Sequence, residues 1–397
     1  MPEFRVGYAQ AVITPPLDPP AYLAGFGRNR VAQSVHDDLY ARVLLLDGFE
    51  QRIALVALDL IGLTYQHCRE VAALVNKTLI GTEVLIACTH VHHGPDTIGL
   101  WGPDLSISGV NPAYMRDLKS TIVRLINEAV QRMETAAVRS VAIPVTGLAK
   151  NARNPDVRDE ELSCLQFVRL GSAAPLVTWL IYPCHPEVLW DGNPHITSDY
   201  VHTLRARIEA ETNAPAIFMA GAMGGMMTPD VRDHSFDESA AMGEALAAAA
   251  LRVLSRAVVQ PVTALSHQRR EFTLPIQSPL LEQAVEVGLL PEIRDKDGLV
   301  TTEASVTRVG SAWIAAVPGE LLPELGLLIK GEMKAEGALL PIVVGLANDE
   351  IGYILPAEDY IYPDNPYEPG EHYEETMSLG PQTAPRLLAA LRSLYRQ

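Results

Sequence analysis

The fold class follows from one stretch of the chain, Val84-Leu85-Ile86-Ala87-Cys88, which runs directly into Thr89-His90-Val91-His92-His93-Gly94-Pro95. A short apolar run bounded by polar residues is typical of a strand that is buried on both faces of a sheet. Runs of the same kind recur along the chain. They predict strands over residues 42–46, 53–58, 84–88, 165–170, 177–182, 216–219, 313–317 and 342–346.

Helical patterns lie between these strands. They cover residues 65–76, 113–133, 200–211, 238–258, 280–287 and 321–336. Strands that alternate with amphipathic helices indicate an α/β fold. No linker-like stretch divides the chain, so we expect a single layered domain over residues 1–397, with a mixed sheet covered on both faces by helices.

Four of the predicted strands end in a turn that carries a polar side chain. In open α/β sheets, ligands bind beyond the carboxyl ends of the strands, so these side chains are expected to meet. Two imidazoles and a carboxylate are a common ligand set for catalytic zinc, and nitrogen ligands favour zinc over calcium or magnesium. The side chains are His90 and His92 after residues 84–88, His185 after 177–182, Glu320 after 313–317 and Tyr353 after 342–346.

Each of these residues also has a simpler explanation when it is taken alone. His185 is explained by a hydrogen bond at a strand end, and Glu320 by the first turn of the helix over residues 321–336. Their joint placement is what favours a metal site. In an extended segment, His90 and His92 point the same way, so one can bind the metal while the other reaches the substrate. His93 then points away and is structural.

Other polar positions have two explanations or a structural one. Asp59 either orients a ligand histidine or caps a helix near Thr64. Ser198 is expected to cap the helix that begins at residue 200. Residues 221–229 form a turn after a strand, which is either an ordinary loop or a flexible turn whose glycines let the backbone approach a ligand. Residues 356–378 are long enough for a lid or a site loop.

Bulk properties exclude some classes of partner. The net charge of −17 argues against nucleic acid and anionic membranes, and no run of 18 apolar residues exists to span a bilayer. The N-terminus has no signal-peptide pattern, so a cytoplasmic protein is expected. The cysteines are far apart and are expected to be buried thiols: Cys68, Cys88, Cys164 and Cys184.

Several motifs resemble, in order, those of the neutral/alkaline non-lysosomal ceramidase family. The segment from Thr89 to Pro95 is similar to the family's T-H-T-H-x-G-P element. The others are Val6-Gly7-Tyr8-Ala9-Gln10-Ala11-Val12-Ile13-Thr14-Pro15, Pro318-Gly319-Glu320, Ala347-Asn348 with Gly352-Tyr353, and Tyr373-Glu374 with Gly380-Pro381.

The resemblance implies an α/β catalytic domain with one zinc ion per chain and cleavage of the amide bond of an N-acylated compound. The implied metal ligands are His90, His185, Glu320 and Tyr353. The implied catalytic residues are His92, Tyr373, which would stabilise the oxyanion, and Arg153, which matches a family arginine with a one-residue shift.

The chain also departs from the family. The serine, asparagine and aspartate of the family's S-N-x-G-D-x-S-P loop are replaced by Ala222, Met223 and Met226. We also expect neither the immunoglobulin-like C-terminal domain nor the secretion signal of the family. We therefore expect a small-molecule N-acyl amide or ester as substrate. An esterase or lactonase on the same site is one alternative, and a non-catalytic metal-containing binding protein is another. A serine hydrolase is disfavoured because no G-x-S-x-G elbow is present.

Overall fold

The computed structural model describes residues 3–290 and 293–396. In this part of the chain the largest sheet has the strand order β11-β9-β8-β6-β1-β3-β4-β5 and mixes antiparallel with parallel pairs. Its strands are β1 (Arg5–Val12), β3 (Tyr40–Gly48), β4 (Gln51–Leu58), β5 (Thr82–Cys88), β6 (Glu134–Pro144), β8 (Glu161–Arg169), β9 (Pro175–Tyr182) and β11 (Ala216–Ala220).

A second large sheet has the order β13-β14-β15-β17. Its strands are β13 (Leu265–Leu274), β14 (Val300–Val309), β15 (Ala312–Ala316) and β17 (Leu340–Val344). The two sheets share one apolar core, in which Leu55 and Trp179 of the first sheet belong to the same buried cluster as Ile314 and Ile342 of the second.

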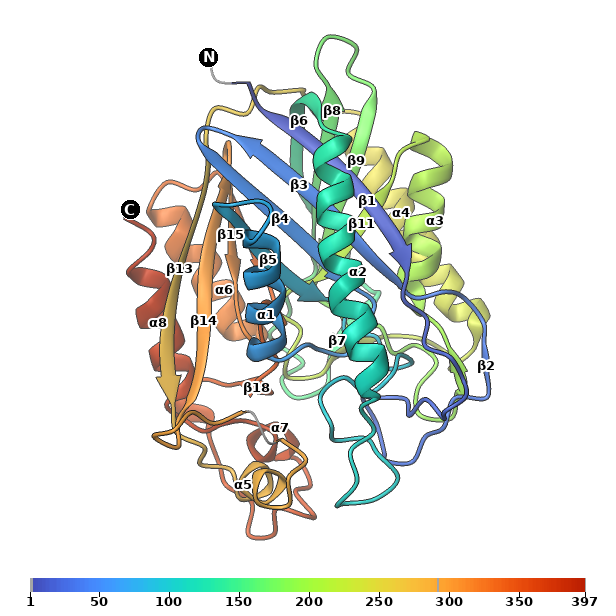
Figure 1. Ribbon diagram of the computed structural model, residues 1–397, viewed down its shortest axis with the longest axis vertical. Helices are drawn as coiled ribbons and strands as arrows, with labels where there is room; N and C mark the ends of the chain where they lie inside the picture. The colour runs from blue at the N-terminus through green and yellow to red at the C-terminus, as the bar shows by residue number, and fades with distance from the viewer. Residues whose placement is uncertain (1–2, 291–292, 397) are drawn as a thin grey trace.

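Helices cover the outer face of each sheet. Apolar side chains of α1 to α4 pack on the first sheet, and those of α6 and α8 pack on the second. Figure 1 shows α6 and α8 on the left, α3 and α4 on the right, and α2 across the middle of the view against the large sheet. The helices are α1 (Tyr65–Asn76), α2 (Pro112–Gln131), α3 (Tyr200–Thr212), α4 (Phe236–Leu254), α5 (Pro279–Glu286), α6 (Pro323–Ala335), α7 (Tyr373–Thr376) and α8 (Thr383–Arg392), with the short 3-10 turn η1 (Ala357–Asp359).

This arrangement confirms an α/β fold and corrects one expectation. Helices do not cover both faces of a single sheet, because the inner face of each sheet is covered by the other sheet. The second sheet was overlooked because β13 and β14 are rich in polar residues instead of forming continuous apolar runs, as the segment Leu265–Leu274 shows. All eight predicted strands and all six predicted helices are present, with bounds shifted by a few residues.

The large sheet curls strongly. Strands β5 and β11 stand at opposite ends of its strand order, yet they contact each other. The carboxyl end of β5 is therefore brought close to the carboxyl end of β9, which is the neighbour of β11. Short ladders join the loops at this end of the molecule: β2 (Ser34–Val35) with β10 (His195–Ile196), β7 (Ala149–Asn151) with β12 (Met227–Pro229), and β16 (Glu320–Leu321) with β18 (Tyr353–Ile354).

Within the described residues, no helix is long and apolar enough to cross a membrane.

Candidate metal centre

His90 follows β5 and is held by backbone on both sides. Its amide donates to the Leu60 carbonyl at 3.0 Å, and its ring Nδ1 donates to the Ile61 carbonyl at 2.6 Å. Because a carbonyl oxygen accepts only, Nδ1 carries the proton and Nε2 presents a lone pair. The backbone at His90 is left-handed, with φ of 66°, so the expected extended segment is not what aims this ring.

His185 follows β9 and is fixed in the same way. Its Nδ1 donates to the Met227 carbonyl at 3.0 Å, and its amide donates to the same oxygen at 2.8 Å. The Nε2 atom therefore also presents a lone pair. This pattern, with Nδ1 bonded to backbone and Nε2 free, is the usual one for a metal-binding histidine.

Glu320 lies opposite both Nε2 atoms. Its Oε2 lies 3.0 Å from Nε2 of His185 and 3.5 Å from Nε2 of His90. Three acceptor atoms this close repel one another unless a proton or a metal ion lies between them. Burial opposes ionisation of Glu320, but the two histidines outweigh it and hold the pKa of the carboxyl below its usual range.

The electrostatics of His185 lead to the same conclusion. Burial lowers its pKa, but the carboxylates of Glu187 and Glu320 outweigh burial and raise it to about 9. The pocket thus favours positive charge at the point where the two Nε2 atoms face Glu320. A bound metal ion supplies such a charge.

Glu320 does not occupy the first turn of a helix, as it was expected to when taken alone. Helix α6 begins at Pro323, and Glu320 lies in β16, where it pairs with Tyr353 of β18. The backbone of Gly224 lies against it, because a Cβ added at Gly224 would come within 2.3 Å of the Glu320 carbonyl oxygen. The loop over residues 221–229 therefore braces Glu320 and, through Met227, His185.

His92 lies beside the other two histidines. Side-chain nitrogens of His90, His92 and His185 lie within 4.8 Å of one another, so the three can hold a metal ion. Nδ1 of His92 is 3.3 Å from Oε2 of the buried Glu187, and neither ring nitrogen of His92 has a hydrogen bond within the described residues. Burial, followed by the neighbouring histidines, lowers the pKa of His92, so its imidazole is neutral and able to accept a proton.

Two tyrosines complete this end of the site. Tyr353 is buried beside Glu320, with its hydroxyl 3.5 Å from the Met226 sulfur. Tyr373 begins α7, and its ring meets that of Tyr353 edge-on at 5.9 Å. Both tyrosines line the same pocket, which also supports the expectation that the loop over residues 356–378 contributes to the site.

Arg153 contacts the helix that carries Tyr373. Its guanidinium donates to Glu374 at 3.0 Å and to Glu375 at 2.9 and 2.8 Å, so it is joined to the helix that begins at Tyr373. Among the described residues, it is not part of the pocket lining.

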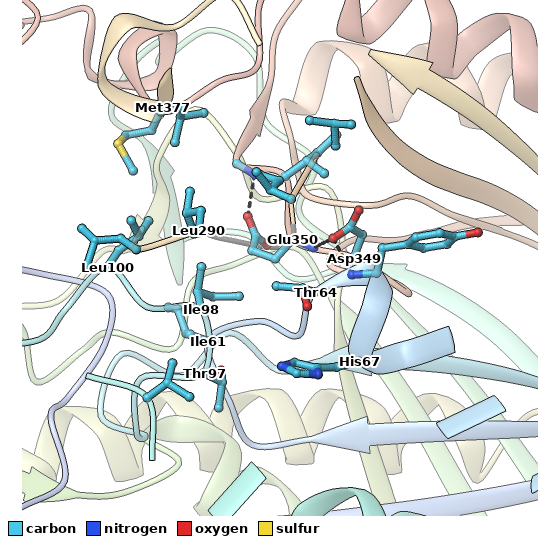
Figure 2. Close-up of a pocket in the computed structure, with 18 of the residues that line it drawn as sticks. Ile61, Thr64, His67, Thr97, Ile98, Leu100, Leu290, Asp349, Glu350 and Met377 are labelled. Carbon is cyan, nitrogen blue, oxygen red and sulfur yellow. Dashed lines mark hydrogen bonds between the residues drawn. The ribbon is translucent and has the colours of Figure 1, made fainter. Parts of the chain in front are cut away.

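The pocket has a volume of about 630 Å³. His90, His92 and Glu320 line it, whereas His185 is fully buried and is not part of the lining. Figure 2 shows apolar side chains on one side and Glu350, Asp349, Thr64 and His67 on the other. The labelled apolar residues are Ile61, Ile98, Leu100, Leu290 and Met377.

Two expectations about nearby polar residues are wrong. Asp59 neither contacts a site histidine nor caps α1. Its carboxylate is bound by both Nη atoms of Arg205, at 2.8 and 2.7 Å, while Asp349 accepts the first amide of α1. The cap of α3 is not Ser198 but Asp199, whose side chain accepts from the Tyr200 amide.

His93 has the structural role expected of it. It is fully buried, and its Nε2 donates to the Trp190 carbonyl at 2.9 Å. The four cysteines are buried free thiols, also as expected.

Two site residues were not identified from the sequence. Glu187 pairs with His92, and its position two residues after His185 was the available signal. Glu350 lines the pocket three residues before Tyr353. Both are acidic residues in turns that already carried a candidate ligand. The contact of Glu187 with His92 and the position of Glu350 in the pocket lining are known only from the three-dimensional structure.

Two solved structures resemble the chain along nearly its whole length. The crystal structure of neutral ceramidase from Pseudomonas aeruginosa matches with a TM-score of 0.80 and 18% identity, covering 99% of this chain and 74% of that one. A ceramidase complexed with C2 matches with a TM-score of 0.81 and 17% identity, covering 99% and 75%. No protein-family model and no curated protein sequence matches. At this identity the likeness establishes the fold, and at that level it confirms the resemblance seen in the motifs.

Proposed function

Because this chain has the fold of the neutral ceramidases, we propose that it is a zinc-dependent hydrolase that cleaves the amide bond of an N-acyl compound. The observation that carries the proposal is the convergence of His90 Nε2, His185 Nε2 and Glu320 Oε2 at one end of a pocket. We further propose that residues 1–397 form a single catalytic domain; residues 1, 2, 291, 292 and 397 lie outside the described part of the chain.

The residues present fit zinc. Two imidazole nitrogens and a carboxylate are ligands that zinc prefers, and one such set supports one ion per chain. Tyr353 is the proposed fourth ligand, since strand pairing places it next to Glu320. When bound, zinc would supply a Lewis acid that activates water and polarises a carbonyl group.

His92 is the proposed general base and acid. Its imidazole is neutral and lies beside the ligand histidines, so it can take a proton from the attacking water and return it to the leaving nitrogen. Glu187, 3.3 Å away, would orient the ring and stabilise its protonated form. Binding of the metal by His92 as a third histidine is the competing role.

Tyr373 is proposed to stabilise the oxyanion, because its side chain lines the pocket next to Tyr353. For Arg153 we propose an indirect part in that step. Its guanidinium is taken up by Glu374 and Glu375, so it would act by fixing α7 and hence Tyr373.

The proposed substrate is a small, water-soluble N-acyl amide in the cytoplasm, and ceramide is expected to be a poor one. The loop that is polar in the ceramidase family is apolar here. Ala222 and Met223 are buried, and Met226 contacts the Tyr353 hydroxyl. Sites that hydrogen-bond a substrate group discriminate by ~10⁴-fold or more against analogues that lack it, so losing such groups should change the accepted substrate.

Metal analysis and a substrate screen test the proposal together. We expect about one zinc per chain, loss of activity on chelation with the fold intact, and recovery on adding zinc. The screen compares kcat/KM for soluble N-acyl amides, the matching esters and lactones, and detergent-dispersed ceramide. Preference for esters would favour an esterase, efficient ceramide cleavage would contradict the soluble-substrate proposal, and zinc binding without turnover would indicate a binding protein.

A further inference from the structure

Glu350 lies in the pocket wall with an incomplete set of hydrogen bonds. Its Oε1 accepts from the Gly352 amide at 2.9 Å. Its Oε2 is buried and has no hydrogen-bond partner in the described part of the chain. Burial, followed by repulsion from Glu320, raises the pKa of Glu350 well above its usual range, so the carboxyl keeps its proton unless a cation lies beside it. A buried carboxyl oxygen without a hydrogen-bond partner is costly, and such groups in native proteins commonly have a functional reason.

The neighbouring Asp349 differs in this respect. Its Oδ1 accepts from the Tyr65 amide at 2.8 Å and from the Glu350 amide at 2.9 Å, which fixes the start of α1 and the turn itself. Asp349 is therefore explained by the fold. Glu350 is not, although both residues line the same pocket.

Packing holds the Glu350 stem in place. A Cβ added at Gly62 would come within 2.7 Å of both Cβ and Cγ of Glu350, and within 3.4 Å of Ile98. The stem thus lies tightly against Gly62, and the soft terminal torsion of the carboxyl group is its main remaining freedom. In Figure 2, Glu350 lies between the apolar side chains Ile98, Leu100 and Leu290 on one side and Asp349 on the other.

The charges around the pocket indicate which donor suits Glu350. The lining includes the further carboxylates of Asp349 and Asp295, and the lining cation Arg294 is already paired with Glu282. A ligand that carries a positive charge and N–H donors would satisfy the free oxygen and offset the negative charge together. A charge-assisted hydrogen bond of this kind is about twice as strong as a neutral one.

We propose that Glu350 is a specificity-determining residue that accepts a hydrogen bond from a protonated amine on the amine-derived part of the substrate. The substrate class is then an N-acylated diamine or a related N-acyl compound with a second, cationic amino group. This inference rests on the proposed amide hydrolase, whose pocket it uses. The apolar side chains opposite Glu350 leave a separate surface for the acyl part.

Binding of non-hydrolysable analogues tests this without turnover. The probes are alkyl sulfonamides whose nitrogen carries an aminoethyl, hydroxyethyl or propyl group, together with the set that is one carbon longer, measured by calorimetry on the purified protein. We expect the ammonium probe to bind at least about tenfold more tightly than the propyl probe, with the hydroxyl probe between them. Equal binding of the ammonium and alkyl probes in both sets would overturn the proposal.

Two variants locate the preference. Glu350→Gln keeps an acceptor for the Gly352 amide but removes the charge, and it should reduce the ammonium preference to within about twofold. Asp295→Asn is the matched control, because it removes one negative charge from the same pocket while its Oδ1 continues to accept from Asp297 and Leu299. If Asp295→Asn abolishes the preference as fully as Glu350→Gln does, general pocket charge and not Glu350 is responsible.

The test of Glu350 can fail or succeed independently of the test of the proposed hydrolase function. Absence of zinc or of amide hydrolysis contradicts the hydrolase, whereas the calorimetric comparison still decides the role of Glu350. Among hydrolysable amides, Glu350→Gln should raise KM for the ammonium substrate by a larger factor than KM for the alkyl substrate. An equal loss of kcat on every substrate would indicate a catalytic or structural role instead.

Discussion

His90 and His185 show how far single residues can be predicted from sequence. Their place after apolar strands indicated that they would meet, and they do meet at Glu320. Their orientation could not be predicted, because each Nδ1 is held by a backbone carbonyl, that of Ile61 or Met227. Every residue has a backbone carbonyl, so the residue types in the sequence do not indicate which carbonyl will accept the hydrogen bond from a histidine ring.

Removing either of the proposed ligand histidines, His90 or His185, should abolish metal binding. His90→Ala or His185→Ala takes away one of the two nitrogens that face Glu320, and we expect both the zinc content and the hydrolase activity to be lost. Elemental analysis of the purified variants measures this. His202→Ala removes an exposed histidine outside the site and serves as the control. Full zinc content in either site variant would show that the ligands are wrongly assigned.

His92 should behave differently from the ligand histidines. As a general base it can be replaced with zinc retained, so His92→Ala should lower kcat by roughly 10²–10⁴-fold at near-normal metal content. Glu187→Gln should give a smaller loss and shift the acid limb of the pH–rate profile, because it weakens the partner of the His92 ring. Loss of zinc from His92→Ala would instead make His92 a third metal ligand, and unchanged turnover would exclude both roles.

At the level of elements, apolar strands were predictable and the amphipathic ones were not. Strand β4 is buried over Ile53–Leu58 and was expected, whereas β13, Leu265–Leu274, is mostly polar and contains charged residues. The short helix α7 was also missed. A helix of four residues has too little periodicity to be recognised, and here it is held by Arg153 through Glu374 and Glu375.

Weakening the anchor of α7 should slow catalysis without releasing the metal. Arg153→Met leaves the buried carboxylates of Glu374 and Glu375 without their cation, so α7 should loosen and Tyr373 lose its position. We expect kcat to fall by about tenfold or more and hydrogen exchange in α7 to increase, at unchanged zinc content. Arg169→Gln breaks an exposed pair with Glu134 and should alter neither. A kcat loss with normal exchange in α7 would favour a direct role of Arg153 at the oxyanion.

For the whole molecule, the curl of the large sheet is what assembles the site. Strand β5 carries His90 at one end of the strand order, and His185 follows β9 near the other end, so a flat sheet would keep them far apart. Their rings are 5.1 Å apart because β5 meets β11. The second sheet then adds Glu320 and Tyr353 after β15 and β17. Sequence patterns predict strands and their faces, but the curl depends on how all strands pack together, which local patterns do not reveal.

The packing of the second sheet also predicts how the molecule responds to acid. His267 of β13 is buried, with Nδ1 2.9 Å from the Thr307 hydroxyl of β14, and burial followed by repulsion from Arg269 lowers its pKa to about 4. An unfolded histidine titrates near ~6.5, so between these values the unfolded chain binds more protons than the folded one. The stability that the neutral His267 provides is therefore complete above about pH 6.5, declines as the pH falls, and is lost near pH 4.

His267→Gln should remove this part of the acid sensitivity, since glutamine keeps a hydrogen-bonding group near Thr307 but does not titrate. Between about pH 7 and pH 4.5 the parent should lose roughly 2–3 kcal/mol more of its free energy of unfolding than the variant does. Urea titrations at the two pH values measure the difference. His93, whose pKa burial also lowers to about 4, stays in both proteins and cancels from the comparison. The control His202→Gln should follow the parent, and a parent and His267→Gln variant that weaken equally on acidification would show that His267 is not held neutral by the fold.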